Sequence, residues 1–109
     1  MDRLAALLAF YEEDPDDAFT RFAIASEYLK RDNKETALTF FEQLVRDKPA
    51  YVGTYYHLGK LLESLDRTAD AIRTYKTGIL KASELQDLHA RAELQDALLN
   101  AQGIGFDDA

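Results

Sequence analysis

Cysteine is absent from the 109 residues of this chain. Without it, neither a disulfide framework nor a thiolate metal site can form. The absence suits a reducing compartment, and we predict a cytoplasmic protein. The chain also lacks a long hydrophobic run: the longest, Leu4–Tyr11, is far shorter than the roughly 18 residues that cross a bilayer. Acidic residues flank this run where a secretion signal would have a basic cluster and a small-residue cleavage site, so we expect neither secretion nor membrane insertion.

Motifs for catalysis, phosphate binding and metal binding are missing as well. There is no glycine-rich phosphate loop. The two histidines, His57 and His89, fall in different expected helices without an H-E-x-x-H motif, and the spacing identifies no third metal ligand. Glu63, Asp66 and Asp70 cluster at a helix turn, where capping and solvation explain them, whereas a catalytic pair of acids needs a cleft and shifted pKa values. We therefore expect no enzyme activity, no metal and no cofactor.

The charge is acidic overall and most acidic at the two ends. The net charge is −7, with −5 in residues 1–17, +3 in residues 18–83 and −5 in residues 84–109. An acidic chain repels phosphate backbones, so we expect no nucleic-acid partner. A solvated surface that aids solubility explains the acidic ends. The alternative is that the mildly basic centre attracts an acidic peptide.

What the sequence does contain is a repeat with a fixed period of 34. Pro15 and Pro49 are one period apart. The same interval relates four residues of the first repeat to residues of matching size and character: Ile24, Ala37, Leu38 and Phe41 to Leu58, Ala71, Ile72 and Tyr75. Such a period in a chain rich in helix formers is typical of stacked helical hairpins. We therefore predict an all-α solenoid of antiparallel helix pairs.

Apolar residues at three- and four-residue spacing, separated by turn residues, place six helices. The expected helices are Asp2–Glu13, Ala18–Arg31, Lys34–Asp47, Val52–Leu65, Ala69–Lys81 and Leu85–Ala101. We predict a single domain over 1–109: a half-repeat or cap helix at 1–14, repeats at 18–49 and 52–83, a capping helix at 85–102 and a tail at 103–109. For the last helix we expect one apolar side, made of Leu88, Ala92, Leu98 and Leu99. Two full repeats are fewer than the three usually needed for stability, so the flanking helices or self-association must supply the rest.

These spacings resemble the tetratricopeptide repeat family. Its pattern places an aromatic residue, then Leu-Gly, Tyr, Ala, an aromatic residue and Pro at set positions. The matching residues are Arg21, Ile24, Ala25, Tyr28, Ala37, Phe41 and Pro49 in the first repeat, and Tyr55, Leu58, Gly59, Leu62, Ala71, Tyr75 and Ser83 in the second. Arg21 replaces the usual aromatic residue, and Ser83 replaces the second closing proline. The resemblance is strong over 18–83, continues as a half repeat over 4–15 and fades in the last helix.

The small residues of the pattern have a physical role. Ala25, Gly59, Ala37 and Ala71 fall where the two helices of a hairpin approach closely, and a larger side chain would push them apart. We expect the bulkier residue of each second helix, Phe41 or Tyr75, to fill the space between neighbouring hairpins.

The resemblance also implies a function, because in this family the first helices of successive hairpins line a concave groove. The corresponding residues are Phe19, Phe22, Ser26, Leu29 and Lys30 in the first repeat, and Gly53, Tyr56, Lys60, Glu63 and Ser64 in the second. We expect this groove to bind a peptide or partner protein of unknown identity, as a scaffold does. The alternative for Phe19 and Phe22 is that they pack against the first helix.

Two further expectations concern the partner. Some members of the family clamp the C-terminal carboxylate of chaperone peptides through Lys and Asn in the first repeat. Phe22 and Ser26 stand at those places, so we do not expect a chaperone tail as the partner. The second hypothesis for the whole chain is a self-associating assembly protein, a homo-oligomer whose groove or repeat edge holds another copy. The tail with Ile104 and Phe106 is one candidate insert.

Overall fold

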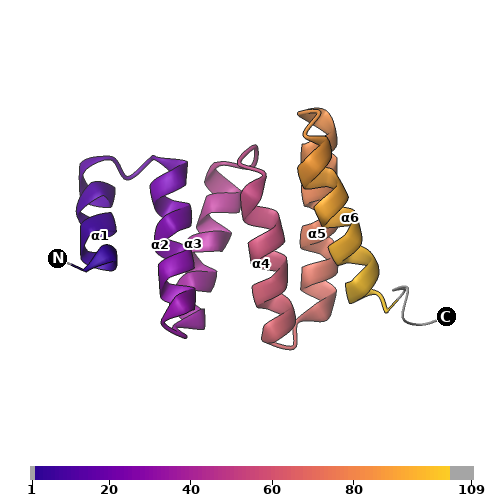
Figure 1. Ribbon diagram of the computed structural model, residues 1–109, viewed down its shortest axis with the longest axis horizontal. Helices are drawn as coiled ribbons and strands as arrows, with labels where there is room; N and C mark the ends of the chain where they lie inside the picture. Colours follow the sequence, from indigo (N-terminus) through magenta and orange to yellow (C-terminus); the bar gives the residue numbers. More distant parts are fainter. Residues whose placement is uncertain (1, 104–109) are drawn as a thin grey trace. The chain divides into compact units, whose positions relative to one another are not determined.

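Six helices form the regular structure of residues 2–103, which are the residues that the computed structural model describes (Figure 1). In chain order they are α1 (Arg3–Glu13), α2 (Ala18–Lys30), α3 (Lys34–Asp47), α4 (Gly53–Ser64), α5 (Thr68–Glu84) and α6 (Leu88–Ala101). Residues 2–103 contain no strand, and the predicted all-α class is confirmed. The tail residues Ile104 and Phe106 lie outside the described residues.

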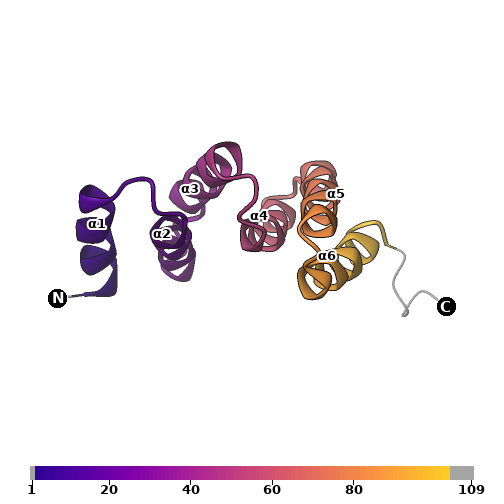
Figure 2. The ribbon, with the colours of Figure 1, turned by 90° about the horizontal axis from the view of Figure 1, so that it is seen from above.

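The chain divides into two compact units, Met1–Tyr51 and Val52–Ala109. In the first unit α2 packs against both α1 and α3. In the second unit α5 packs against both α4 and α6, and α4 also contacts α6. Figures 1 and 2 show α6 beside α5 from two directions. That the whole of 1–109 acts as one domain stays a prediction.

Side chains that precede the helices satisfy free amides of the first turn. Asp17 before α2 accepts a hydrogen bond from the backbone N–H of Thr20 at 2.9 Å, and Asn33 before α3 accepts one from Thr36 at 3.3 Å. Asp2 and Asp87 cap α1 and α6 in the same way. Because Asp, Asn and Ser are the strongest N-cap residues, these positions define where four of the helices begin.

The repeat period is visible in the backbone as well as in the side chains. Asp32 and Asp66, one period apart, both have φ of 60°, and each follows the last turn of a first helix. The next residue closes the turn in both places: the N–H of Asn33 donates to the carbonyl of Tyr28, and that of Arg67 donates to Leu62, each at 2.9 Å. Both helices thus end at a residue in the left-handed conformation, a position where glycine or asparagine is usually found.

The core of the first unit lies mainly between its helices. Leu7 of α1 packs with Ala23 and Ile24 of α2, and five partly buried residues surround this cluster: Leu4, Leu8, Tyr11, Tyr28 and Phe40. On the other side of α2, the fully buried residues are Ala25, Ala37, Phe41 and Leu44. Ala25 and Ala37 are thus buried as the repeat pattern requires.

In the second unit, Gly59 of α4 lies directly against Tyr75 of α5. A Cβ atom added to Gly59 would be 2.1 Å from the ring atom Cε1 of Tyr75. No side chain fits at that distance unless the ring moves, so the close approach predicted for Gly59 is present. Tyr75 itself is fully buried, against the first helix of its own hairpin. We expected Tyr75 to fill the space between neighbouring hairpins. That expectation did not include its contact with Gly59 inside its own hairpin.

The predicted apolar side of the last helix is wrong. Leu88, Ala92 and Leu99 are exposed, whereas Leu94 and Ala97 are buried. The reason is that α6 packs against both α5 and α4, and Leu94 reaches Gly78, the place where α5 has no side chain. The helix also begins at Leu88, later than predicted, because Gln86 takes a left-handed conformation with φ of 57° and Asp87 caps the helix.

Candidate functional site

A pocket of about 230 Å³ lies in the second unit, between α4 and α6. Its lining residues come from the start of α4 and the first half of α6: Val52, Gly53, Tyr56, His57, Ala90, Glu93 and Leu94. Gly53 and Ala90 carry little or no side chain, so the backbones of both helices border the space. Apolar Val52 and Leu94 and polar Tyr56, His57 and Glu93 therefore share one small hollow.

Tyr56 is the aromatic residue of this pocket. Its ring meets the ring of His57 edge-on, with centroids 5.6 Å apart and an interplanar angle of 81°. The ammonium of Lys60 lies 5.6 Å from the centroid of the same ring, a distance at which a cation is attracted to an aromatic face. Tyr56 is half-buried, so part of its surface stays available to another molecule.

The ionisable groups around the pocket are Glu93 and the two histidines, His57 and His89. Although His57 keeps an exposed surface, the protein atoms around its ring lower its pKa, and the nearby Glu93 carboxylate works in the opposite direction. A lowered pKa leaves His57 mostly uncharged at neutral pH. The Nε2 atom of His89, one turn before Glu93, is 3.5 Å from that carboxylate.

The predicted groove residues of the second repeat have different surroundings. Gly53 and Tyr56 line the pocket, and Lys60 lies over Tyr56. Glu63 accepts a hydrogen bond from the hydroxyl of Tyr75 at 2.5 Å and is 4.0 Å from Lys60, so it serves the hairpin's own structure. The hydroxyl of Ser64 donates to the carbonyl of Leu61 in its own helix at 2.7 Å.

Five pocket residues were not among the predicted groove residues: Val52, His57, Ala90, Glu93 and Leu94. The sequence contains a signal for three of them. Ala90 follows Tyr56 by one period, and Leu94 follows Lys60 by the same interval. Treating the last helix as the first helix of a third repeat, rather than as a cap, would have placed Ala90, Glu93 and Leu94 beside the groove.

The predicted groove residues of the first repeat lie on α2. Phe19 is 63% exposed. Phe22 is half-buried, with its ring centroid 5.9 Å from those of both Phe41 and Tyr51. Ser26 and Leu29 are half-buried, and Lys30 is exposed. The residues that meet α1 in the core are Ala23 and Ile24, so the ring of Phe22 finds its packing partners on α3 and the segment after it.

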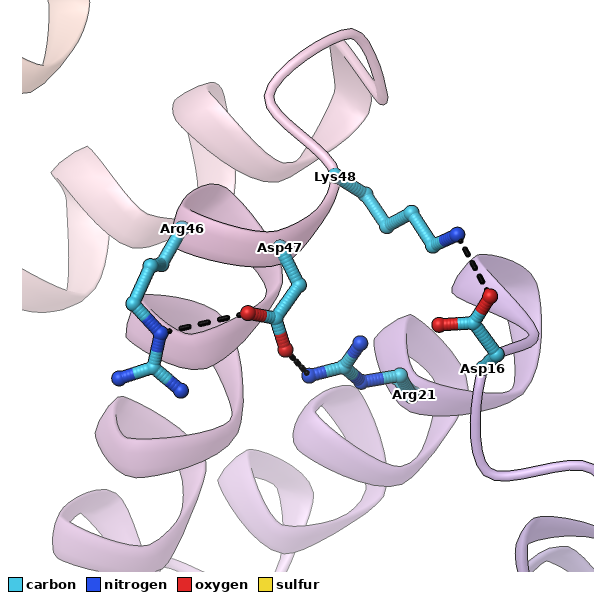
Figure 3. Close-up of polar contacts among 5 residues, drawn as sticks. All are labelled: Asp16, Arg21, Arg46, Asp47 and Lys48. Atoms are coloured by element: carbon cyan, nitrogen blue, oxygen red, sulfur yellow. Dashed lines mark hydrogen bonds and ion pairs between the residues drawn. The ribbon is translucent and has the colours of Figure 1, made fainter.

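A second hollow, of about 420 Å³, lies in the first unit, where α3 ends. It is lined by Ala18, Asp47, Lys48, Pro49, Ala50 and Tyr51. Ion pairs hold its edge, as Figure 3 shows: Arg21 donates to Asp47 at 2.6 Å, and Lys48 donates to Asp16 at 2.9 Å. The Arg21–Asp47 pair explains why an arginine can stand where the repeat pattern has an aromatic residue. The guanidinium of Arg21 is buried, and the carboxylate of Asp47 is its charge partner. The hydrogen bond from Arg21 holds the pKa of Asp47 below its ordinary value.

Two other kinds of feature are missing from the described residues. Across residues 2–103, no group of three or more His, Cys, Asp or Glu side chains is arranged to hold a metal ion. None of the described helices combines the length and apolar character needed to cross a membrane.

Comparison with known proteins gives matches among solved structures only. No family model matches the chain, and no curated protein does. A tetratricopeptide repeat domain protein from Salinibacter ruber, solved by NMR, is 57% identical over 85% of this chain and 94% of its own, with a TM-score of 0.80. A crystal structure of such a protein from the same organism is also 57% identical, over 82% of this chain and 100% of its own, with a TM-score of 0.78.

A more distant match agrees in fold alone. The TPR2B domain of yeast Sti1, solved as a complex with pHsp70, has a TM-score of 0.84 at 17% identity, over 92% of this chain and 80% of its own. The two Salinibacter structures decide the family, since their identity is high and this chain covers nearly all of their length. Together with the repeat period and the helical hairpins, they show that the chain belongs to the tetratricopeptide repeat family.

Proposed function

We propose that this chain is a non-catalytic interaction module that binds a peptide or partner protein on its first helices. The pocket between α4 and α6 carries the proposal, because it combines an aromatic wall, an apolar floor and charged groups at its rim. Repeat proteins of this kind use the surface formed by successive repeats for binding. The yeast Sti1 domain in its complex with pHsp70 supports a protein partner by analogy of fold.

The size of the pocket favours a peptide side chain over a cofactor. Its volume of about 230 Å³ is smaller than the ~300–1,000 Å³ of most small-molecule sites. One large apolar or aromatic side chain of a peptide could enter between Tyr56 and Leu94. A carboxylate on that peptide would be attracted to Lys60, whereas a second carboxylate near Glu93 would be repelled.

The experiment selects peptides from a random library against the wild-type protein and measures their affinity for variants. Ala90→Arg fills the pocket with a long side chain, and we expect it to weaken binding at least tenfold. Ala69→Arg, the same change at an exposed alanine of α5, is the matched control and should bind as the wild type does. Selected peptides that bind equally well to folded Ala90→Arg protein would disprove the pocket as the binding site.

The wider groove stays part of the proposal. Phe22 and Tyr56 occupy equivalent places one period apart, and alanine at either is expected to weaken partner capture. Tyr56→Ala is the cleaner test, because Phe22 also packs against Phe41 and Tyr51. We also propose that the chain acts as a scaffold and that it does so in the cytoplasm.

Self-association is the second candidate function, and two exposed helix faces, one on α1 and one on α6, favour it.

A further inference from the structure

The two outer helices correspond to opposite halves of a repeat. Leu7 of α1 precedes Phe41 by one period and Tyr75 by two, so α1 corresponds to the second helix of a hairpin. His89 of α6 follows Tyr55 by one period, so α6 corresponds to a first helix. Within residues 2–103, no first helix precedes α1 and no second helix follows α6. Among the described residues, α1 and α6 each stand without a hairpin partner.

The faces that a hairpin partner would cover carry exposed apolar residues. Phe10 of α1 is 58% exposed, whereas Leu44, one period later, is fully buried. Leu88 of α6 is 70% exposed, whereas Thr54, one period earlier, is fully buried. Ala92, which corresponds to the buried Leu58, is exposed as well. The counterparts of buried Tyr55, Gly59 and Leu62 on α6 are the polar His89, Glu93 and Asp96, so the face of α6 is mixed and its apolar part is Leu88 and Ala92.

The contacts inside the α4–α5 hairpin tell which residues of α1 and α6 would meet. There Tyr55 lies against Gly78, and Gly59 lies against Tyr75. Moving each residue by whole periods turns the first pair into His89 with Phe10 and the second into Glu93 with Leu7. In each new pair the larger member has become smaller and the smaller one larger. Such reciprocal exchange of size keeps the space between two helices filled. Phe10 and His89 are both exposed and free to meet, whereas Leu7 is already buried against α2.

Charges near a contact between α1 and α6 would attract each other, whereas the net charges of the two ends of the chain would repel. Arg3 lies one turn before Leu7, and its side chain is 62% exposed although it is 3.5 Å from Glu27. It can therefore approach Glu93 and Asp96 on an opposing α6. The two ends of the chain are nonetheless acidic, with −5 in residues 1–17 and −5 in residues 84–109. Association between such ends should be weak in low salt and stronger when salt screens the repulsion.

We propose that α1 of one molecule packs on α6 of a second copy of this chain and completes a hairpin there. The contact joins two different surfaces, so each dimer keeps a free α1 and a free α6, and further copies can add head to tail. This assembly goes beyond the proposed peptide binding. It also specifies the self-association hypothesis, with the repeat edge rather than the groove as the contact.

The absence of cysteine allows a direct test by disulfide trapping. One protein carries Phe10→Cys, a second carries His89→Cys, and the two are mixed under mild oxidation. A disulfide needs Cα atoms within about 4.4–6.8 Å, so it reports the specific pair. We expect the mixed disulfide to form well above the amounts of either symmetric dimer. Lys76→Cys, at an exposed site on α5, replaces His89→Cys in the control mixture and should give no such excess. A random distribution of disulfides in both mixtures would overturn the proposal.

Sedimentation of the unmodified protein and two further variants gives an independent result. The average mass of the wild type should rise with protein concentration and with salt. Phe10→Asp and Leu88→Asp change exposed residues and should keep the fold, yet each is expected to weaken association about tenfold or more. Wild type that stays monomeric at its solubility limit in high salt would refute the contact. Phe10→Asp should leave peptide binding unchanged, so failure of one proposal can be told from failure of the other.

Discussion

A Cβ atom added to Gly78 would lie 2.6 Å from the Cβ of Tyr55 and 3.0 Å from Cδ1 of Leu94. Three helices of the second unit therefore meet at a residue that has no side chain. The alanine usual in helices would be accommodated there only if α4 or α6 moved.

Gly78→Ala should therefore destabilise the protein, although alanine has the higher helix propensity. Overpacking of this kind costs about 1–3 kcal/mol, and the propensity gain of up to about 1 kcal/mol offsets only part of it. Urea unfolding followed by circular dichroism measures the difference. Gly53→Ala, at an exposed position of α4, is the matched control and should be neutral or slightly stabilising. Equal stability gains in both variants would contradict the packing at Gly78.

Tyr75 should make the protein sensitive to alkali. Burial raises its pKa strongly, and the hydrogen bond to Glu63 raises it further. An unfolded tyrosine ionises near pH 10, so this contribution to the free energy of unfolding is complete below about pH 10 and is lost as the pH rises above it. Tyr75→Phe should be less stable than the wild type at pH 7. Between pH 9 and pH 11, on either side of the unfolded pKa of about 10, it should lose less stability than the wild type does. Denaturant titrations at several pH values test this, with Tyr11→Phe as the control. Parallel pH curves for wild type and Tyr75→Phe would count against it.

The Arg21–Asp47 pair should show the opposite pH dependence. The pKa of Asp47 is lowered, chiefly by the hydrogen bond from Arg21, so the pair stabilises the fold above the unfolded pKa of about 3.9 and is lost as the pH falls through the lower folded value. Asp47→Asn should lower the melting temperature at pH 7, because it leaves the buried guanidinium of Arg21 without its charge partner.

A double-mutant cycle separates this pairing from other effects of the substitution. In an Arg21→Leu background, Asp47→Asn should change the melting temperature little. Equal decreases in both backgrounds would mean that the two residues do not act together.

Gln86 offers a stabilising substitution. Its φ of 57° is a conformation that glycine adopts without the steric cost that a side chain brings. Gln86→Gly should raise the free energy of unfolding by about 0.5–1 kcal/mol. The same change inside α6, Gln95→Gly, should instead lower it by about 1 kcal/mol. Thermal unfolding of both variants gives the comparison, and a loss of stability in Gln86→Gly would show that its side chain has a role in the turn.

Local features of the sequence were enough to predict most of the helices. The bounds of α3 agree to the residue, because Asn33 caps its first turn and Pro49 follows its end. The positions of Gly59 and Ala71 also follow from the repeat spacing. These features depend on residues within one or two turns of each other, or one period apart.

What the sequence did not predict depends on contacts between distant residues. The partner of Arg21 lies 26 residues away on α3, and no spacing rule identifies it. The buried side of α6 depends on the gap at Gly78, so the leucines of that helix could not be assigned to the inside or the outside from periodicity alone. The pocket between α4 and α6 was missed for another reason: the last helix was interpreted as a cap, although Ala90 and Leu94 follow the groove residues Tyr56 and Lys60 by one period.

The matching left-handed turns at Asp32 and Asp66 make the reversals of the two hairpins interchangeable. Because the chain reverses with the same backbone geometry one period apart, a turn sequence that suits one hairpin should also suit the other. A loop improved in one hairpin can therefore be transplanted into the second.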